Sequence, residues 1–332
     1  MKAGCRDLPF FLNSVEKSTP SPTQHDRHIW VKPWSLAEGF LIALGLVATG
    51  LMLELSIGPV VWEAFSWPIN IFVLSGMLAL MSTMYALRGK VYAFRFIGTY
   101  TAAVPVLIFA VLLTMIMGLT RQTMNGRWLN DMLSFWPFVL IYVYIAFILS
   151  QIIIRRILHF HLRRDIPFLL NHLGLFTALV CATLGNADMQ RLKMIAAVDE
   201  AEWRAMNEQG DVVELPLAIE LKRFIMEEYP AEEEVTTTER TMMKERTPRR
   251  FASDVQIYTQ SGLNISATVD VNKPVSVAGW QIYQYGYDTV AGAMSRISIF
   301  ELVRDPWLPF VYIGIWMMLL GAVCMFILAQ RK

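Results

Sequence analysis

Cysteine is scarce in this chain of 332 residues, and the positions of its three cysteines exclude several kinds of site. Cys5 lies in a polar N-terminal stretch, whereas Cys181 and Cys324 lie within apolar runs. Residues 185–306 contain no cysteine, so they hold no disulfide framework, no CxxC redox pair and no CxxCH haem-attachment site. The sequence is therefore not that of a c-type cytochrome or a thiol oxidoreductase.

Charge is also scarce: charged residues make up 17% of the chain, apolar residues 55%, and the mean hydropathy is +0.42. Several near-uncharged runs reach the roughly 20 residues that a helix needs to cross a bilayer. We predict six spans: Leu36–Ser56, Trp67–Leu87, Ile97–Leu119, Phe135–Ile154, Ile166–Leu184 and Trp307–Ala329. The chain is therefore expected to be a polytopic α-helical membrane protein, with a five-span bundle over residues 36–184 and a final span over 307–329.

Loops rich in Lys and Arg alternate with loops poor in them, and this alternation predicts the orientation of the chain in the membrane. Lys and Arg precede the first span and follow the second, fourth and last spans, whereas Glu54–Ser66 has none and Thr120–Ser134 has only Arg121 and Arg127. The positive-inside rule then places both termini in the cytoplasm, with residues 1–35 as a cytoplasmic tail. Residues 185–306 are expected on the opposite side, in the periplasm of a Gram-negative cell.

This outer segment is expected to be an all-β domain between the last two spans. Alternating or β-rich stretches predict strands at Leu215–Tyr229, Phe251–Tyr258, Leu263–Val271, Val275–Tyr285 and Ser295–Val303. Together they suggest a small β-sandwich or open barrel, and the polar run from Glu232 to Arg250 suggests a solvated loop. From Asn186 to Asp305 there are 20 acidic and 13 basic side chains, a net charge of −7. This charge argues against nucleic-acid binding and favours a basic protein partner.

Catalytic motifs are lacking as well. No P-loop, nucleophile elbow, zinc-ligand spacing or GxGxxG turn occurs, so no catalytic residue is predicted. His25 and His28 lie in the N-terminal tail without further ligands, which favours solvated side chains over a metal site.

His172 is the main candidate for a functional residue, because it lies within the fifth predicted span. An ionisable side chain in the hydrocarbon region is costly and marks a functional-site hypothesis, and imidazole is a common ligand of haem iron. At 1.5 Å per residue it lies roughly 10 Å from the cytoplasmic end, about a third of the way across. Gly174 offers a close approach to a planar ligand or to a neighbouring helix. The alternative is a packing histidine, hydrogen-bonded to a carbonyl or hydroxyl.

Four other polar residues have weaker functional interpretations. His159 and His161 lie between paired arginines and suit a basic interfacial turn better than an anion site. Arg121 and Arg127 are candidates to bind haem propionates, although pairing with acidic groups of the β domain is the stronger expectation.

Several segments resemble the ResB (CcsB) family of System II cytochrome c biogenesis. The fifth span and its exit contain NHLGLF from Asn171 and GNADMQRLK from Gly185. The β segment contains VNKPVSVAGWQIYQYGY from Val271, and LVRDP from Leu302 runs into VYIGI at the last span. These matches cover roughly residues 165–330. The NHLGLF form and the compact length are most similar to ResB-like proteins of the Bacteroides group.

The resemblance implies a cytochrome c maturation factor of the bacterial inner membrane that handles haem together with a CcsA-like partner. Haem b would be bound transiently, His172 would supply an axial ligand to its iron, and the pair would join haem to apocytochrome c. The tryptophan-rich haem segment and outer histidines belong to CcsA and are not found in this chain. The chain would therefore be one component of a haem-lyase complex. Family members commonly have four spans and a larger outer domain, so the hairpin over Ile97–Ile154 is a departure.

Two other functional classes stay open at this point. The chain could be an accessory subunit of a membrane respiratory complex, with His172 ligating haem b for electron transfer. That role usually needs two opposed axial histidines, and His172 is the only deep one here. It could also be a membrane scaffold that binds no haem.

Overall fold

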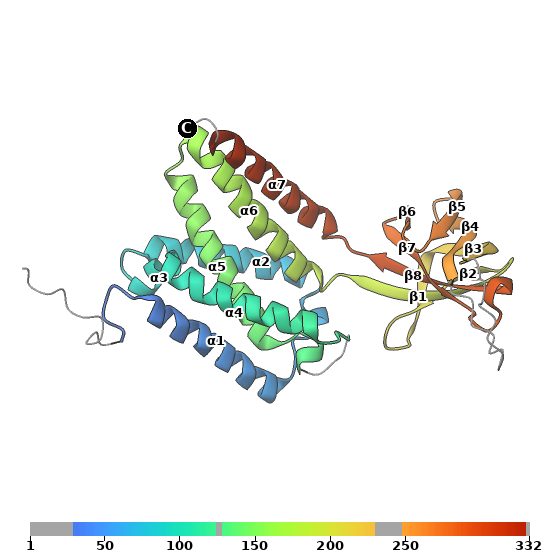
Figure 1. The fold of residues 1–332 in the computed structure, drawn as a ribbon, viewed down its shortest axis with the longest axis horizontal. Coiled ribbons are helices and arrows are strands. Elements are labelled where there is room, and N and C mark those ends of the chain that lie inside the picture. The colour runs from blue at the N-terminus through green and yellow to red at the C-terminus, as the bar shows by residue number, and fades with distance from the viewer. Residues whose placement is uncertain (1–28, 124–127, 230–247, 330–332) are drawn as a thin grey trace, which may run out of the picture.

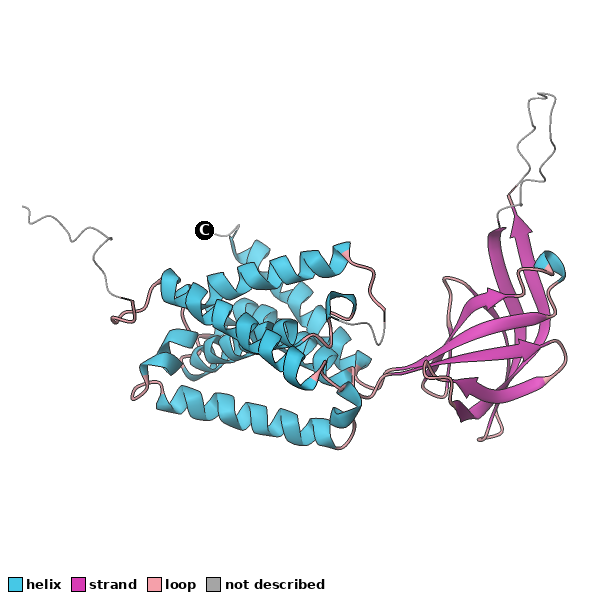
Figure 2. Cartoon of the chain, turned by 90° about the horizontal axis from the view of Figure 1, so that it is seen from below, coloured by secondary structure: helices cyan, strands magenta, loops and turns pink. Residues whose placement is uncertain are grey.

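The computed structural model describes residues 29–123, 128–229 and 248–329, which form a helical bundle and a β domain (Figures 1 and 2). Within these residues, six helices are long and apolar enough to cross a membrane. They are α1 (Leu36–Ile57), α2 (Ile69–Leu87), α4 (Tyr100–Leu119), α5 (Trp136–Leu158), α6 (Leu162–Gly185) and α7 (Leu308–Ala329). The six predicted spans are therefore confirmed, with shifted bounds.

The bounds shift where local chemistry begins or ends a helix. A capping box begins α1, in which the Ser35 side chain caps the helix and the Glu38 carboxylate accepts a hydrogen bond from the Ser35 backbone N–H. The span predicted from Ile97 begins three residues later. Ile97 is the last residue of a short helix α3 (Tyr92–Ile97), Gly98 caps that helix, and α4 begins after Thr99. Helix α5 continues to Leu158, beyond the predicted end at Ile154, so Arg155 and Arg156 belong to its last turn.

Helix α5 is the centre of the bundle. It packs against α1, α2, α4 and α6, and ten of its residues are buried. The buried cluster is made of apolar side chains from α1, α4 and α5, including Ala43, Val106, Phe138 and Ile141. A helix surrounded on several sides is held in place by its neighbours, so α5 positions the side chains that α6 presents to it.

Helices α6 and α7 run side by side in Figure 1 and make the closest helix pair. Glycines allow this approach: a Cβ on Gly174 would lie 2.5 Å from the Gly314 carbonyl oxygen, and one on Gly321 would lie 2.7 Å from the Asn171 backbone nitrogen. Small residues at an interface let helix backbones touch in a membrane, where lipid removes most of the hydrophobic driving force.

The β domain is inserted between α6 and α7 and is one eight-stranded antiparallel sheet. Its strands are β1 (Gln190–Ala197), β2 (Ala201–Met206), β3 (Val212–Glu228), β4 (Pro248–Thr259), β5 (Asn264–Asp270), β6 (Val275–Val277), β7 (Trp280–Tyr287) and β8 (Ile297–Arg304). Their order is β5-β4-β3-β2-β1-β8-β7-β6. The two ends of the sheet approach each other, since β5 contacts β6 and β7. The sheet is thus curled into an open barrel.

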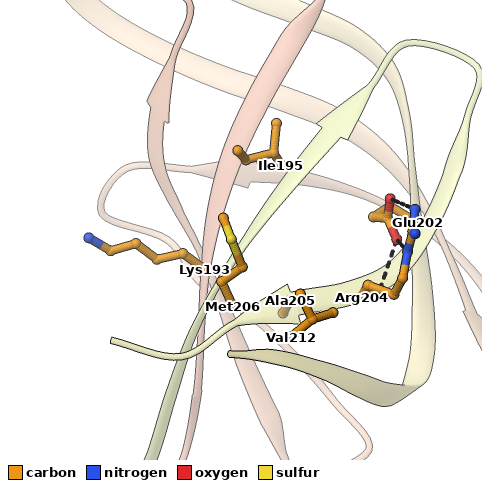
Figure 3. A pocket seen from close by; sticks show the side chains of 7 residues that line it. All are labelled: Lys193, Ile195, Glu202, Arg204, Ala205, Met206 and Val212. Carbon is orange, nitrogen blue, oxygen red and sulfur yellow. Dashed lines mark hydrogen bonds and ion pairs between the residues drawn. The ribbon is translucent and has the colours of Figure 1, made fainter. Parts of the chain in front are cut away.

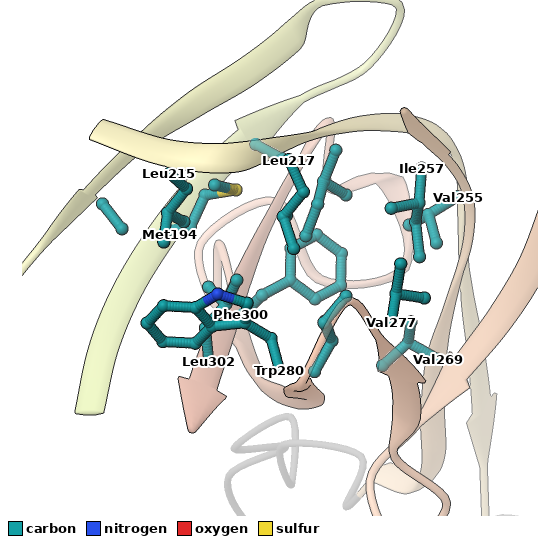
Figure 4. Close-up of a cluster of buried hydrophobic side chains, with 14 of the residues drawn as sticks. Met194, Leu215, Leu217, Val255, Ile257, Val269, Val277, Trp280, Phe300 and Leu302 are labelled. Carbon is teal, nitrogen blue, oxygen red and sulfur yellow. The ribbon is translucent and has the colours of Figure 1, made fainter. Parts of the chain in front are cut away.

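An apolar core fills the inside of this curled sheet (Figure 4). Alternating residues of β1, β3 and β8 point inward, and Met194, Leu217 and Phe300 are among the most buried. Trp280 and Leu302 belong to the same buried cluster. Burial of these side chains stabilises the domain by roughly 1.5–3 kcal/mol for each large one.

The strand predictions need three corrections. Strands β1 and β2 were not predicted. The single strand expected at Val275–Tyr285 is a hairpin, in which Ala278 and Gly279 have φ of +49° and +83° and form a two-residue turn between β6 and β7. The loop predicted from Glu232 to Arg250 lies mostly outside the described residues, but Pro248–Arg250 belong to β4, where Arg250 pairs with Glu227.

The domain joins the bundle at one place, because β1 leaves α6 and β8 returns to α7 side by side. The two strands pair along their whole length, from Gln190 opposite Arg304 to Ala197 opposite Ile297. The domain consequently lies beyond one end of the helices, as Figures 1 and 2 show.

Candidate functional site

His172 lies on α6 with one ring nitrogen hydrogen-bonded to its own helix. Its Nδ1 is 2.9 Å from the carbonyl oxygen of Phe168, and its ring stacks on the Phe168 ring with centroids 3.8 Å apart and planes 20° apart. A carbonyl oxygen only accepts, so Nδ1 carries a proton, and in the neutral imidazole Nε2 carries the lone pair. No group in the described part of the chain hydrogen-bonds Nε2, and the side chain is half-buried.

This arrangement is the one that metal-binding histidines use. They donate the proton of one ring nitrogen to a carbonyl or carboxylate, which sets the tautomer and aims the other nitrogen at the metal. The same hydrogen bond is what a packing histidine would make, as the sequence also allowed. The packing alternative leaves a lone pair without a donor, whereas a ligand would use it.

Arg156 and Asp165 support the Phe168 ring at the end of the bundle farther from the β domain. The Arg156 guanidinium lies 4.5 Å from the Phe168 ring centroid and pairs with the Asp165 carboxylate at 3.1 Å. Asp165 is fully buried and also accepts the backbone N–H of His161 at 2.8 Å. Contacts therefore run without a gap from Asp165 through Arg156 and Phe168 to His172.

Gly174 serves the neighbouring helix, because the α7 backbone at Gly314 occupies the space beside it. Two residues along a helix correspond to a rotation of about 200°, so His172 faces away from α7. The same face of α6 carries Phe176 and Leu179, which pack on the bundle core around α5.

The other predicted site residues lie apart from His172. Arg121 follows α4 at the end of the bundle nearest the β domain, whereas His172 lies in the half of α6 farther from it, so the structure does not bring them together. Arg127, His25 and His28 lie outside the described residues. His159 and His161 bond through Nδ1 to the backbone carbonyls of Arg155 and His159, at 3.1 and 2.9 Å.

Sequence reasoning used Arg156 only as an orientation signal and missed its contact with Phe168. The two residues lie on different helices, and no spacing in the sequence predicts a cation above that ring. Among the described residues, no group of three or more His, Cys, Asp or Glu side chains could hold a metal ion. His172 therefore offers a single protein ligand.

Pockets also occur away from His172 in the described structure, two of them in or beside the β domain. A pocket of about 170 Å³ lies between β1, β2 and β3, and Figure 3 shows Arg204 paired with Glu202 at its edge. The guanidinium donates two hydrogen bonds to the Glu202 carboxylate, at 2.9 and 3.0 Å. A larger pocket of about 690 Å³ lies where α2, α6 and α7 meet the β domain, and it includes Trp67, Cys181 and Trp307. Sequence reasoning found neither.

The fold defines a multi-pass membrane protein with a β domain inserted before its last apolar helix. Residues 161–299 match the model of the ResB-like family, so this part of the chain, from α6 into β8, is ResB-like. The predicted resemblance to the ResB family is thereby confirmed over these residues.

A solved structure described as cytochrome c haem lyase CcmF matches with a TM-score of 0.35 and 13% sequence identity. The match covers 89% of this chain and 46% of that chain, so this chain spans less than half the length of that protein. No curated protein matches the sequence at a significant level.

Proposed function

We propose that the chain is the ResB-like component of a System II cytochrome c maturation complex and handles haem b as cargo with a CcsA-like partner. The match over residues 161–299 supports the family role. The observation that supports a ligand site is the geometry of the His172 imidazole. Its Nδ1–H donates to the Phe168 carbonyl, and Nε2 of the neutral ring keeps a free lone pair. When bound, haem supplies an iron that accepts this lone pair.

The site offers a single histidine ligand, so the proposed haem site includes a partner protein. His172 is the only histidine within the six apolar helices. A second histidine ligand would therefore have to come from outside these helices, and a partner protein could supply it. The same fact disfavours a respiratory subunit that binds its own bis-histidine haem.

The proposed orientation follows from the loop charges, with both termini in the cytoplasm and residues 185–306 in the periplasm of the bacterial inner membrane. His172 then lies in the inner half of the bilayer, where it meets haem arriving from the cytoplasm. The β domain, with its net charge of −7 over Asn186–Asp305, faces the compartment in which basic apocytochromes c receive haem. This chain contributes binding and positioning, while bond formation to apocytochrome belongs to the complex.

The test is absorption spectroscopy of the purified full-length chain, alone and co-expressed with the tryptophan-rich partner. We expect the complex to show a haem Soret band that His172→Ala abolishes and that added imidazole restores. His159→Ala is the matched control, because His159 also bonds a carbonyl four residues earlier but lies exposed at the end of α5.

Haem retained in His172→Ala would remove His172 from the ligand role. A complex that purifies with no haem in any preparation would favour a scaffold. Haem held by the chain alone, and never transferred to apocytochrome, would favour the respiratory subunit.

A further inference from the structure

The 690 Å³ pocket at the junction is an amphiphilic site at the level of the membrane interface. Its walls come from the first turns of α2 and α7 and the last turns of α6, where Ile71, Leu74 and Phe310 are apolar and Trp67 and Trp307 are aromatic. Its rim carries Asp188, Gln190 and Arg304 from the connections to the β domain. Tryptophan is enriched at the height of lipid headgroups, which places this rim there.

Asp188 is held as a carboxylate by three donors from distant parts of the chain. The backbone N–H of Trp67, the amide of Asn70 and the indole N–H of Trp307 donate to it at 2.7, 2.7 and 2.6 Å. Partial burial raises the pKa of Asp188, but the three hydrogen bonds lower it by a larger amount. The net pKa of Asp188 is therefore below the usual range. A carboxylate accepts about four hydrogen bonds, so one position is left for a further donor.

Arg304 is the cation of the same rim. It is exposed at the end of β8, opposite Gln190 of β1, and forms no ion pair within the described residues, including with Asp188. The rim thus presents one positive and one negative group that do not neutralise each other. Below them the pocket is apolar.

We propose that this pocket binds a phospholipid with a zwitterionic phosphoethanolamine headgroup. The phosphate meets Arg304, the ammonium donates to the free position of Asp188, and an acyl chain lies along Ile71, Leu74 and Phe310. Guanidinium and phosphate form strong charge-assisted hydrogen bonds, and the carboxylate complements the ammonium. Haem suits this rim poorly, because its paired carboxylates would face Asp188. The site is independent of the role proposed for His172.

The experiment is native mass spectrometry of the full-length chain released from nanodiscs that contain equal amounts of phosphatidylethanolamine, phosphatidylcholine and phosphatidylglycerol. We expect phosphatidylethanolamine to be retained preferentially and Arg304→Gln to reduce its retention about tenfold, as expected for one lost charge-assisted hydrogen bond. Arg191→Gln is the matched control, because this exposed arginine is adjacent to Gln190 on β1 and therefore projects from the other face of the strand.

A second variant, Leu74→Trp, fills the apolar part without touching either charge, and it too should lower retention. Equal retention of phosphatidylcholine, whose ammonium has no N–H, would overturn the Asp188 contact. Retention unchanged in both Arg304→Gln and Leu74→Trp would overturn the site. Displacement of the lipid by added haem, with a Soret band sensitive to Arg304→Gln, would replace it with a haem site.

Discussion

The hydrogen bond from His172 to the Phe168 carbonyl determines what the imidazole can bind. It leaves one unprotonated nitrogen on the face of α6 directed away from α7, and the ring is held by stacking on Phe168. The stack rests in turn on Arg156, which the buried Asp165 carboxylate orients. Sequence reasoning identified His172 from its cost in an apolar helix. It did not identify Arg156 and Asp165 as its support, because their contacts cross from α5 to α6.

Substitution of Arg156, which supports the Phe168 ring, should lower the free energy of unfolding, whereas substitution of the neighbouring Arg155 should not. Arg156→Gln removes the guanidinium that pairs with the buried Asp165 carboxylate at 3.1 Å and lies over the Phe168 ring, and we expect a loss of about 2 kcal/mol in the free energy of unfolding, discounted for the partial exposure of Arg156. Arg155→Gln removes the same charge from an exposed position and should change stability by less than about 0.5 kcal/mol. Thermal unfolding in detergent measures both, and equal effects would contradict the proposed support.

At the scale of the elements, glycine positions decide how α6 meets α7. Hydropathy predicts both helices from their length, because an apolar backbone in lipid must satisfy its own hydrogen bonds. Hydropathy does not say which helix α6 touches, and Gly174 suited either a planar ligand or a helix. The structure resolves this: the Gly314 backbone lies where a side chain on Gly174 would be.

Adding one methyl group at this contact should separate the helices. In Gly174→Ala or Gly314→Ala the new Cβ meets backbone atoms at 2.5 or 2.6 Å, so we expect destabilisation by about 1–3 kcal/mol. Gly76→Ala in α2 is the control, since nothing lies within 4 Å of that position. The control should gain up to about 1 kcal/mol from helix propensity. Cysteine crosslinking between α6 and α7 gives a second readout, which should fall only in the first two variants.

Strands β1 and β2 show why the domain was only partly predictable. Residues 190–206 are rich in Ala, Met, Glu, Lys and Arg, which favour helices, and contain few β-branched residues. Pairing of β1 with β8 along eight positions overrides that preference. The later strands, such as β5, alternate clearly and were found, although the β6–β7 turn was missed.

At the scale of the whole molecule, Asp188 joins the bundle to the β domain. Its three donors lie 121, 118 and 119 residues away along the chain, so one carboxylate ties the start of α2 and the start of α7 to the end of α6. The same residue forms part of the rim of the lipid pocket. The orientation of the domain on the helices therefore depends on a charged group at the interface.

Acid should loosen this junction. The folded-state pKa of Asp188 lies below its unfolded value, so its stabilisation is present above about pH 4 and is lost as the pH falls through the lowered pKa. At pH 7 we expect Asp188→Asn to destabilise the protein by about 2 kcal/mol, and this difference from the wild type should shrink as the pH falls. Hydrogen exchange in residues 186–190 and 304–308 reports the opening. Glu208→Gln, at an exposed turn, is the control, and a difference that did not depend on pH would exclude the charge as the cause.

The sequence by itself determined the six apolar helices, the inserted β domain and the ResB-like identity of residues 161–299, because these depend on local hydropathy, periodicity and motif. It also singled out His172, since an ionisable group within an apolar run is visible without a structure. Only the tertiary structure decided which nitrogen of His172 is free, which helix Gly174 meets and which residues surround Asp188. Those properties depend on contacts between segments up to 121 residues apart, and close packing, not local preference, selects such contacts.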